Sequence, residues 1–148
     1  MKIHFKFKNL HSCEAVVLAC IDFRFWKETM KFVEEELGIK SYDFPKLPGA
    51  AKSINDCLSE VDIAMKCIGV PCDLHHVKKI VIVNHADCGA YGGSVQFKGD
   101  DEAEQKFHEG ELRKAKEKII AQYPGKEVIL AYAKLVDGGE FVEFLRVD

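Results

Sequence analysis

Ala15-Val16-Val17-Leu18-Ala19 is an uninterrupted apolar run, and Ile80-Val81-Ile82-Val83 is a second one, rich in β-branched residues. Runs of this kind are typical of strands that are buried on both faces of a parallel sheet. Amphipathic helical patterns separate and follow the two runs, and strands that alternate with helices indicate a sheet covered by helices on both faces. The sequence therefore predicts a three-layer α/β fold around a mostly parallel sheet.

The remaining segments extend this layout. Apolar side chains recur at helical spacing in three segments that we expect to be helices: residues 25–37 before Gly38, residues 54–68 ending at Gly69 and Pro71, and residues 100–122. Alternating or apolar patterns predict further strands at residues 3–7, 41–44 and 128–135, and a hairpin partner at residues 141–145. We expect a central sheet of about four mostly parallel strands, an antiparallel C-terminal edge strand and flanking helices.

The length and composition bound the class of protein. The chain has 148 residues, 47% hydrophobic and 30% charged, which predicts a single domain spanning residues 1–148. The formal net charge is −3 and the basic residues are scattered, so we expect no nucleic-acid partner, which would need a clustered basic face. No apolar run approaches the roughly 20 residues of a membrane span. Residues 1–8 lack the apolar stretch of a signal peptide, and we expect no membrane association and a cytoplasmic location.

Polar side chains follow both apolar runs, where each predicted strand ends. Cys20-Ile21-Asp22-Phe23-Arg24 follows the first run, and His85-Ala86-Asp87-Cys88-Gly89 comes one residue after the second. Ligands of open parallel sheets bind outside the carboxyl ends of the strands, so Cys20, His85 and Cys88 should converge there. Two thiols and an imidazole suit a zinc ion and leave a fourth position for water, substrate or a carboxylate.

Asp22 and Arg24 are alternate residues of an extended segment, so their side chains point to the same side and can pair. The pair would keep Asp22 ionised, either to orient a zinc-bound hydroxide or to occupy the fourth position itself. Gly89 would let the backbone pass close to the metal and begin a helix, whose N-terminus favours the thiolate of Cys88. The plainer interpretation is that the cysteines and the histidine are simply buried residues, because HxxC spacing often arises by chance.

Together, Cys20-x-Asp22-x-Arg24 and His85-x-x-Cys88-Gly89 resemble the signature of the β-class carbonic anhydrases, as does the order of strands and helices. The resemblance implies that Cys20, His85 and Cys88 bind one Zn²⁺ per chain, and that Asp22 and Arg24 form the dyad that controls the fourth position. It implies zinc-dependent reversible hydration of CO₂ to bicarbonate by a zinc-bound hydroxide. It also implies a homodimer or a dimer of dimers, in which Phe5, Phe7, Phe23, Phe25 and Trp26 are candidates to be covered by a partner.

The chain departs from the family pattern in three ways. Bulky Phe23 stands where the family usually has serine, and Lys46-Leu47-Pro48-Gly49-Ala50 keeps only the glycine of an Arg-Asn-Ala-Gly-Asn-like segment. Only 19 residues precede Cys20, fewer than the long N-terminal helical arm of many members would need. These departures leave open a related zinc hydrolase acting on COS or CS₂, or a catalytically silent zinc-stabilised binding or assembly protein. A thiol-based redox protein is a further alternative, opposed by the lack of a CxxC motif.

The other cysteines and histidines have weaker interpretations. Cys67 and Cys72, with His75 and His76 close behind, could form a second metal or redox cluster. Cys57 is expected in the core and Cys13 is expected to be incidental. A titratable group must export the proton of the reaction, and the sequence does not rank the candidates, which are His4, His11, His75, His76 and His108.

Overall fold

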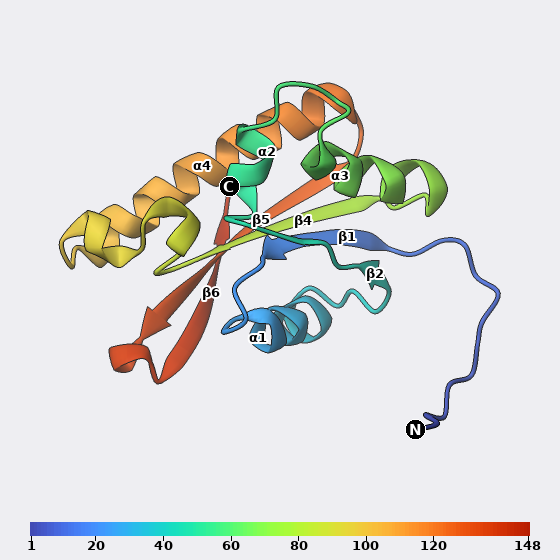
Figure 1. Ribbon diagram of the computed structural model, residues 1–148, viewed down its shortest axis with the longest axis horizontal. Helices are drawn as coiled ribbons and strands as arrows, with labels where there is room; N and C mark the ends of the chain where they lie inside the picture. Colours follow the sequence, from blue (N-terminus) through green and yellow to red (C-terminus); the bar gives the residue numbers. More distant parts are fainter.

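A six-stranded sheet forms the centre of the computed structural model, which describes residues 1–148 (Figure 1). The strands are β1 (Ala15–Cys20), β2 (Tyr42–Asp43), β3 (Lys46–Leu47), β4 (Lys79–His85), β5 (Glu127–Val136) and β6 (Phe141–Val147). The α-helices are α1 (Trp26–Lys31), α2 (Ala51–Asn55), α3 (Ile63–Leu74) and α4 (Asp101–Gln122). Shorter turns are the π-helix η1 (Phe32–Glu36) and the 3₁₀-helices η2 (Gly89–Tyr91), η3 (Ser94–Phe97) and η4 (Asp137–Gly139).

The strand order β2-β1-β4-β5-β6 confirms the predicted fold class. β1 runs parallel to β4, with Val17 opposite Val81, and β4 runs parallel to β5. The short strands β2 and β3 both pair in parallel with β1, and β6 closes the other edge as the antiparallel partner of β5. Because β1 and β4 are parallel neighbours, their carboxyl ends meet at one edge of the sheet.

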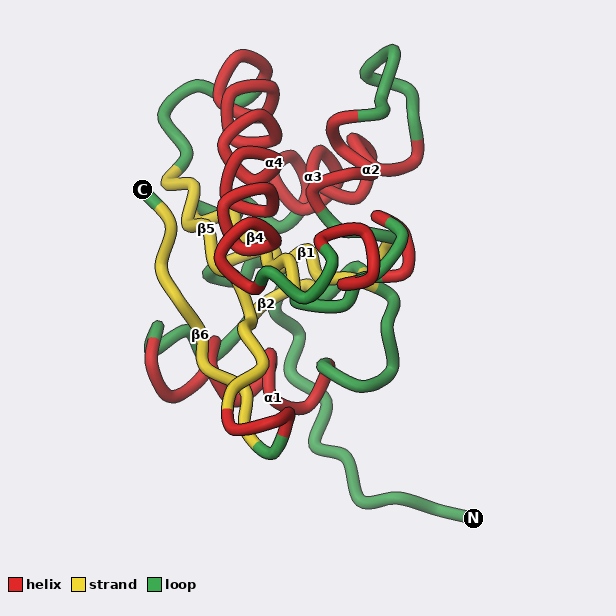
Figure 2. Tube along the Cα trace, turned by 90° about the vertical axis from the view of Figure 1, so that its left-hand side faces the viewer, coloured by secondary structure: helices red, strands yellow, loops and turns green.

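Helices cover both faces of the sheet, as predicted. α2, α3 and α4 lie on one face, and α1 with η1 lies on the other (Figures 1 and 2). β1 is buried throughout because alternate residues enter two different cores. Val16 and Leu18 pack in the core under α2, α3 and α4, whereas Val17 packs in the core under α1 and η1. Each such side chain stabilises the fold by about 1.5–3 kcal/mol through burial, which is why this run forms a central strand.

The predicted strand at residues 3–7 is wrong. Residues 1–13 contain neither helix nor strand, and the segment before β1 runs away from the sheet as an extended tail (Figure 1). The side chains of Ile3, Phe5 and Phe7 are more than 70% exposed. An alternating pattern produces a strand only where a neighbouring edge offers hydrogen bonds, and the edge beside β1 is already occupied by β2 and β3.

The single helix predicted over residues 54–68 is also wrong, because two helices form there. α2 ends at Asn55 and α3 begins at Ile63. The Asp62 carboxylate accepts hydrogen bonds from the backbone N–H groups of Leu58 and Ser59, which closes a turn between the two helices. Leu58, counted in the helical stripe, is consequently exposed in this turn.

The predicted end of that helix at Gly69 and Pro71 is wrong too, since α3 continues to Leu74. A Cβ at residue 69 would lie 2.5 Å from Oη of Tyr123, so this glycine provides space for a neighbour rather than a helix end. Pro71 lies inside α3 and is buried, so helix packing outweighs its missing N–H.

The other predicted helices are present. The segment at residues 25–37 forms α1, continued by the π-helical turn η1. In α4, the Asp100 side chain caps the N-terminus by accepting from the N–H of Ala103. The predicted helix after Cys88 is only the short 3₁₀ turn η2. None of the helices is both long and apolar enough to cross a bilayer.

Candidate metal centre

Three side chains converge at the edge where β1 and β4 end. Cys20 is the last residue of β1, His85 is the last residue of β4, and Cys88 follows in the next turn. All three residues are buried, and their ligand atoms lie within 4.8 Å of one another. The two Sγ atoms are 3.7 Å apart. Residues that are far apart in the sequence therefore form one compact donor set.

The ring of His85 is oriented so that one nitrogen faces this set. Nδ1 lies 2.7 Å from the backbone oxygen of Ala86, and a carbonyl can only accept, so the proton is assigned to Nδ1. Nε2 then carries a lone pair, and it is buried without a hydrogen-bond partner. Phe25 stacks on the ring with centroids 4.2 Å apart, which fixes the ring plane. A buried and unpartnered nitrogen is costly unless a ligand satisfies it.

The pKa values of the two thiols are shifted in opposite directions. A hydrogen bond from Cys88 holds the pKa of Cys20 well below its ordinary value, and the N–H of Gly49 also donates to the Cys20 sulfur at 3.3 Å. The same hydrogen bond and burial raise the pKa of Cys88 far above its ordinary value. Two thiolates this close repel one another strongly in a buried site, so both become ionised only if a cation lies between them.

The donor set fits a zinc ion. Zinc prefers thiolate and imidazole ligands in tetrahedral geometry, with Zn–S distances of about 2.3 Å. A tetrahedral edge between two such sulfurs is about 3.8 Å long, close to the observed 3.7 Å between Cys20 and Cys88. The orphaned Nε2 of His85 supplies a third donor. One position of the tetrahedron then remains for a fourth ligand.

Arg24 connects the two loops that carry the donors. Its Nε and Nη2 atoms donate to the carboxylate of Asp22 at 2.6–3.1 Å. Its Nη1 donates to Oδ2 of Asp87 at 2.9 Å, and Nη2 also donates to the backbone oxygen of Asp87. One guanidinium thus joins the loop after β1 to the loop after β4, a geometry that the planar fork of arginine allows and a lysine does not.

Asp22 is held ionised beside the donor set. Hydrogen bonds from Arg24 lower the pKa of Asp22 to about 2. Its Oδ2 lies 3.9 Å from Nε2 of His85, although Asp22 is outside the group of atoms within 4.8 Å of one another. Both oxygens of the carboxylate are engaged by Arg24, so the side chain is retained at the rim of the site.

Gly49 is the one residue of the segment 46–50 that matches the family pattern, and its backbone conformation explains why a glycine stands there. It has a φ of +69°, and a Cβ here would lie 2.8 Å from Cβ of Lys52 and 3.1 Å from Cβ of Ala90. Only glycine fits this conformation and this close approach, which bring the Gly49 N–H to the sulfur of Cys20.

Comparisons with known proteins identify the family. Residues 10–140 match a protein-family model described as "Putative carbonic anhydrase". The chain is 32% identical over 127 residues to an uncharacterized protein of Rickettsia conorii, covering 82% of this chain and 67% of that protein. An uncharacterized protein of Rickettsia bellii is 29% identical over 126 residues, covering 82% of this chain and 76% of that one.

Solved structures agree with this match. The β-carbonic anhydrase isoform I of Trichomonas vaginalis superimposes with a TM-score of 0.59 at 15% identity, covering 98% of this chain and 87% of that chain. The β-carbonic anhydrase CafA of Aspergillus fumigatus gives 0.57 at 17% identity, covering 91% and 76%. Tetrameric β-carbonic anhydrases of Sordaria macrospora give 0.50 at 18% identity, covering 91% and 81%. The chain is a divergent member of the β-carbonic anhydrase family.

Several residues that support the site in this carbonic anhydrase family member were not singled out from the sequence. Asp87 has a φ of +54°, and its N–H donates to the buried carboxylate of Glu104 at 2.8 Å. Glu104 also accepts from the hydroxyl of Ser94 at 2.7 Å, so α4 supports the loop that carries Cys88. The position of Asp87 inside the HxxC motif was a usable signal. Phe25 and Glu104 lie outside both motifs and carried none.

The predicted second cluster does not assemble as expected. Cys72 packs in the core, Cys67 is half-buried, and neither shares a ligand group with His75 or His76. His75 instead lies close to Cys13 and Asp43 at the opposite edge of the sheet. Cys57 packs against the core, as expected. Phe25, a candidate to be covered by a partner, is instead buried within the chain, where it stacks on His85.

His108 lies behind the site on α4 and is completely buried. Its Nδ1 accepts a hydrogen bond from the side-chain amide of Asn84, and its Nε2 is 3.9 Å from a carboxylate oxygen of Glu104. Burial lowers the pKa of His108 to about 4, so the ring is neutral in the folded protein near pH 7. The other candidate proton carriers do not line the donor set: His4, His11 and His76 are exposed.

This burial predicts a pH-dependent stability. The pKa of histidine in the unfolded chain is about 6.5, so the unfolded state binds the proton more tightly. Stability is therefore fully present above about pH 6.5 and is lost as the pH falls toward about 4. Between about pH 7.5 and pH 5, the free energy of unfolding should fall by about 2 kcal/mol more in the wild type than in His108→Gln. Urea unfolding at the two pH values measures this difference, and equal losses in both proteins would contradict it.

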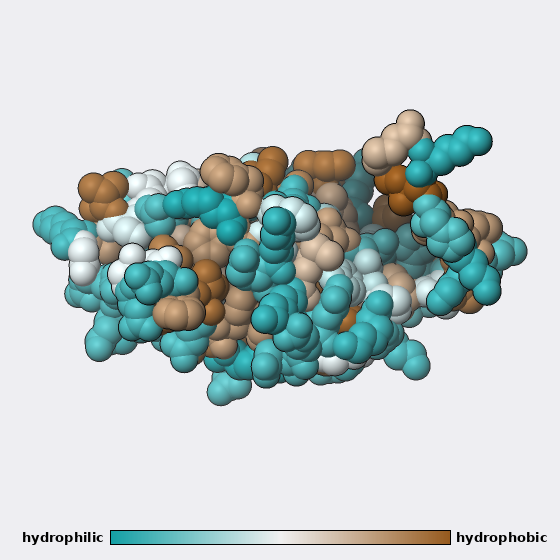
Figure 3. Space-filling view, turned by 90° about the horizontal axis from the view of Figure 1, so that it is seen from below, coloured by the Kyte–Doolittle hydropathy of each residue, from teal (hydrophilic) through white to brown (hydrophobic).

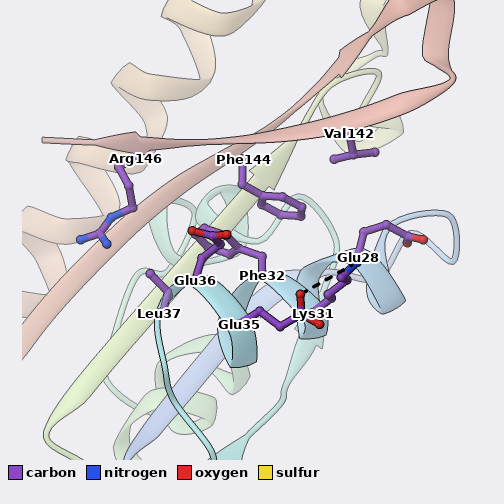
Figure 4. A pocket seen from close by; sticks show the side chains of 9 residues that line it. All are labelled: Glu28, Lys31, Phe32, Glu35, Glu36, Leu37, Val142, Phe144 and Arg146. Carbon is purple, nitrogen blue, oxygen red and sulfur yellow. Dashed lines mark ion pairs between the residues drawn. The ribbon is translucent and has the colours of Figure 1, made fainter.

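A large groove of the molecule lies away from the metal centre. A groove of about 550 Å³ lies between α1, η1 and β6, where the rings of Phe32 and Phe144 stack at 4.5 Å (Figure 4). Its rim carries an ion pair between Lys31 and Glu35. None of the converging donor residues lines it. A small cavity of about 10 Å³ instead adjoins Cys20 and His85, walled by Ala19, Val83 and the rings of Phe25 and Trp26.

Proposed function

We propose that this chain is a zinc lyase that catalyses the reversible hydration of CO₂ to bicarbonate. The observation that carries the proposal is the convergence of two sulfurs and the buried, unpartnered Nε2 of His85 at one edge of the sheet. Membership of the carbonic anhydrase family supports the same activity. In this proposal Cys20, His85 and Cys88 hold one Zn²⁺ per chain.

Bound zinc supplies the acidity that makes water a nucleophile near neutral pH. Asp22, ionised and accepting only, would receive a hydrogen bond from the attacking water and so orient its lone pair toward CO₂. Arg24 engages both oxygens of Asp22 and thereby keeps the carboxylate from entering the donor set. We therefore favour a fourth position that is open to water over one closed by Asp22.

The surroundings suit a small, uncharged substrate. Beside Cys20 and His85 the walls are apolar, with Ala19, Val83 and the ring of Phe25. CO₂ has no net charge and needs no large cavity, whereas bicarbonate carries a charge that the same apolar walls do not stabilise. Hydration thus produces a charged product that leaves more readily than it would from a polar pocket.

We also propose that the chain acts as a homodimer or a dimer of dimers. Phe5, Phe7 and Phe23 are more than 70% exposed, and Trp26 is 40% exposed next to the metal centre. Apolar side chains also appear between hydrophilic ones on the face that carries α1 (Figure 3). Large apolar side chains exposed to solvent are candidates for burial against a partner. The structurally similar Sordaria macrospora enzymes are tetrameric, which supports an assembly of this kind.

Stopped-flow measurement of CO₂ hydration tests the proposed activity. Zinc-quantified protein should accelerate the reaction over about pH 6.5 to 9, and Asp22→Asn should reduce kcat/KM by about 10–100-fold. COS and CS₂ are run as competing substrates in the same assay. A protein that contains one zinc at the Cys20 site and hydrates none of the three substrates would contradict the enzymatic proposal.

That negative result would support the second candidate, a catalytically silent zinc-stabilised assembly protein. The observation that favours this candidate is Phe23, whose side chain is 81% exposed beside the metal centre. A large exposed ring at this position is better suited to contact with a partner than to passage of a small substrate. Faster zinc-dependent turnover of COS or CS₂ than of CO₂ would instead assign the related hydrolase activity.

A further inference from the structure

A second group of potential metal ligands lies at the opposite edge of the sheet from the Cys20 site. Nδ1 of His75 is 2.6 Å from Oδ2 of Asp43, and Sγ of Cys13 is 3.6 Å from the same oxygen. The ligand atoms of all three side chains lie within 4.8 Å of one another, and each residue is partly buried. Neither sequence motif of the carbonic anhydrase site includes any of these residues.

The backbone holds these residues together independently of any ligand. Cys13 lies two residues before the start of β1, and its N–H donates to the backbone oxygen of His75 at 3.1 Å, at the end of α3. Asp43 belongs to β2, where it is paired with Val16 of β1. The start of one strand, a neighbouring strand and a helix end therefore each contribute one donor to a fixed position.

The donor chemistry favours zinc over calcium or magnesium. One thiol, one carboxylate and one imidazole form a mixed S, O and N set, whereas calcium and magnesium take oxygen ligands only. A thiolate and a carboxylate together carry a charge of −2, which a divalent cation balances. The thiol and the imidazole both direct their polar atoms at one oxygen of Asp43, so a cation would replace protons that now lie between these groups.

We propose that Cys13, Asp43 and His75 bind a second zinc ion, separate from the Cys20 site. The ion would connect the start of β1 to β2 and to the end of α3. Asp43 and His75 also line a groove of about 510 Å³, together with Phe44, Lys66 and Val70. A coordination position left by three protein ligands can face this groove and take water.

Zinc binding at this site releases a proton. Burial and the neighbouring Asp43 carboxylate raise the pKa of Cys13, so without a cation the thiol is protonated near pH 7. A metal-bound cysteine is a thiolate, and the displaced proton goes to the buffer. Proton release that depends on Cys13 is therefore expected when zinc is added.

Equilibrium dialysis of the zinc-free full chain against Zn²⁺ tests the site. Cys13→Ser, Asp43→Asn and His75→Gln should each bind one zinc equivalent per chain fewer than the wild type. Cys67→Ser and His76→Asn are matched controls, because they remove a nearby cysteine and histidine outside the group, and they should bind as much zinc as the wild type. Three variants are used so that a folding defect in one of them leaves the test intact.

The result is independent of the proposed CO₂ hydration. If the Cys20 site binds no zinc, the Cys13 variant still binds one equivalent less than the wild type. Cobalt provides a second readout, since Co²⁺ bound to a thiolate produces a charge-transfer absorption band. In Cys20→Ser/Cys88→Ser protein this band should persist, and it should disappear when Cys13→Ser is added. Unchanged zinc binding by all three variants, or a loss equal to that of the two controls, would overturn the proposal.

Discussion

Cys88→Ser should bind one zinc equivalent per chain less than the wild type, and its CO₂ hydration should fall to the uncatalysed rate. Cys88 is buried, its sulfur lies 3.7 Å from that of Cys20, and its removal leaves two donors where tetrahedral zinc needs three protein ligands. Metal analysis and stopped-flow hydration measure the two losses. Both losses should occur together, because the same ion supplies the acidity that the reaction needs.

The stability of this variant separates metal loss from simple misfolding. A ligand present at about 1,000 times its Kd stabilises the folded state by about 4 kcal/mol, so with zinc present the variant should unfold more easily by about this amount. With a chelator present, the difference should shrink to about 1 kcal/mol, the usual size of a substitution effect. Cys67→Ser is the matched control, because Cys67 is a half-buried cysteine outside both ligand groups. A difference that the chelator leaves unchanged would contradict metal binding by Cys88.

Arg24→Lys should retain zinc and lose kcat/KM by about 10–100-fold. Arg24 binds Asp22 through two nitrogens and Asp87 through Nη1, and a single ammonium cannot make both contacts at once. The Asp22 carboxylate would then be free to leave the rim and to compete for the fourth position. Stopped-flow hydration on zinc-quantified protein measures the loss of activity while metal analysis confirms that zinc is kept.

Arg113→Lys is the matched control for this substitution. Arg113 also bonds a carboxylate and a backbone oxygen, and its side chain is 48% exposed against 42% for Arg24. It should keep the wild-type rate. In the double variant Arg24→Lys/Asp22→Asn, the fold loss of kcat/KM should be smaller than the product of the two single losses. Both substitutions break the same interaction between Arg24 and Asp22. Wild-type kinetics in Arg24→Lys, or multiplicative losses in the double variant, would exclude the positioning role of Arg24.

The sequence was sufficient to predict the central layout and the main donor group. β1 and β4 are continuous apolar runs, and such runs have few alternatives to a buried parallel strand. Once these two strands are neighbours, the residues after them share one edge. That geometry brings Cys20 and His85 together without further information.

Tertiary contacts explain the expectations that failed. The pattern at Ile3, Phe5 and Phe7 favours a strand, but the edge of β1 is already paired with β2 and β3. The helical stripe through Leu58 ignores the Asp62 carboxylate, which closes a turn there. Local patterns describe what a segment can do, whereas pairing and side-chain capping decide which conformation it adopts.

The same distinction holds for the sites. Phe25 is the residue directly after the CxDxR motif, but its stacking on His85 arises only when the fold brings the loop after β1 next to the end of β4. The group formed by Cys13, Asp43 and His75 joins residues up to 62 positions apart with no shared motif, so spacing alone could not reveal it. Clusters built from single residues of separate elements become visible only when the strands and helices are placed in space.

X-ray absorption at the zinc edge of Cys13→Ser protein loaded with one zinc tests the central claim most directly. This variant leaves the Cys20 site as the remaining zinc site. The spectrum should show two sulfur neighbours at about 2.3 Å and nitrogen or oxygen neighbours at about 2.0–2.1 Å. A zinc environment of nitrogen and oxygen only, or protein that takes up no zinc, would contradict coordination by Cys20, His85 and Cys88.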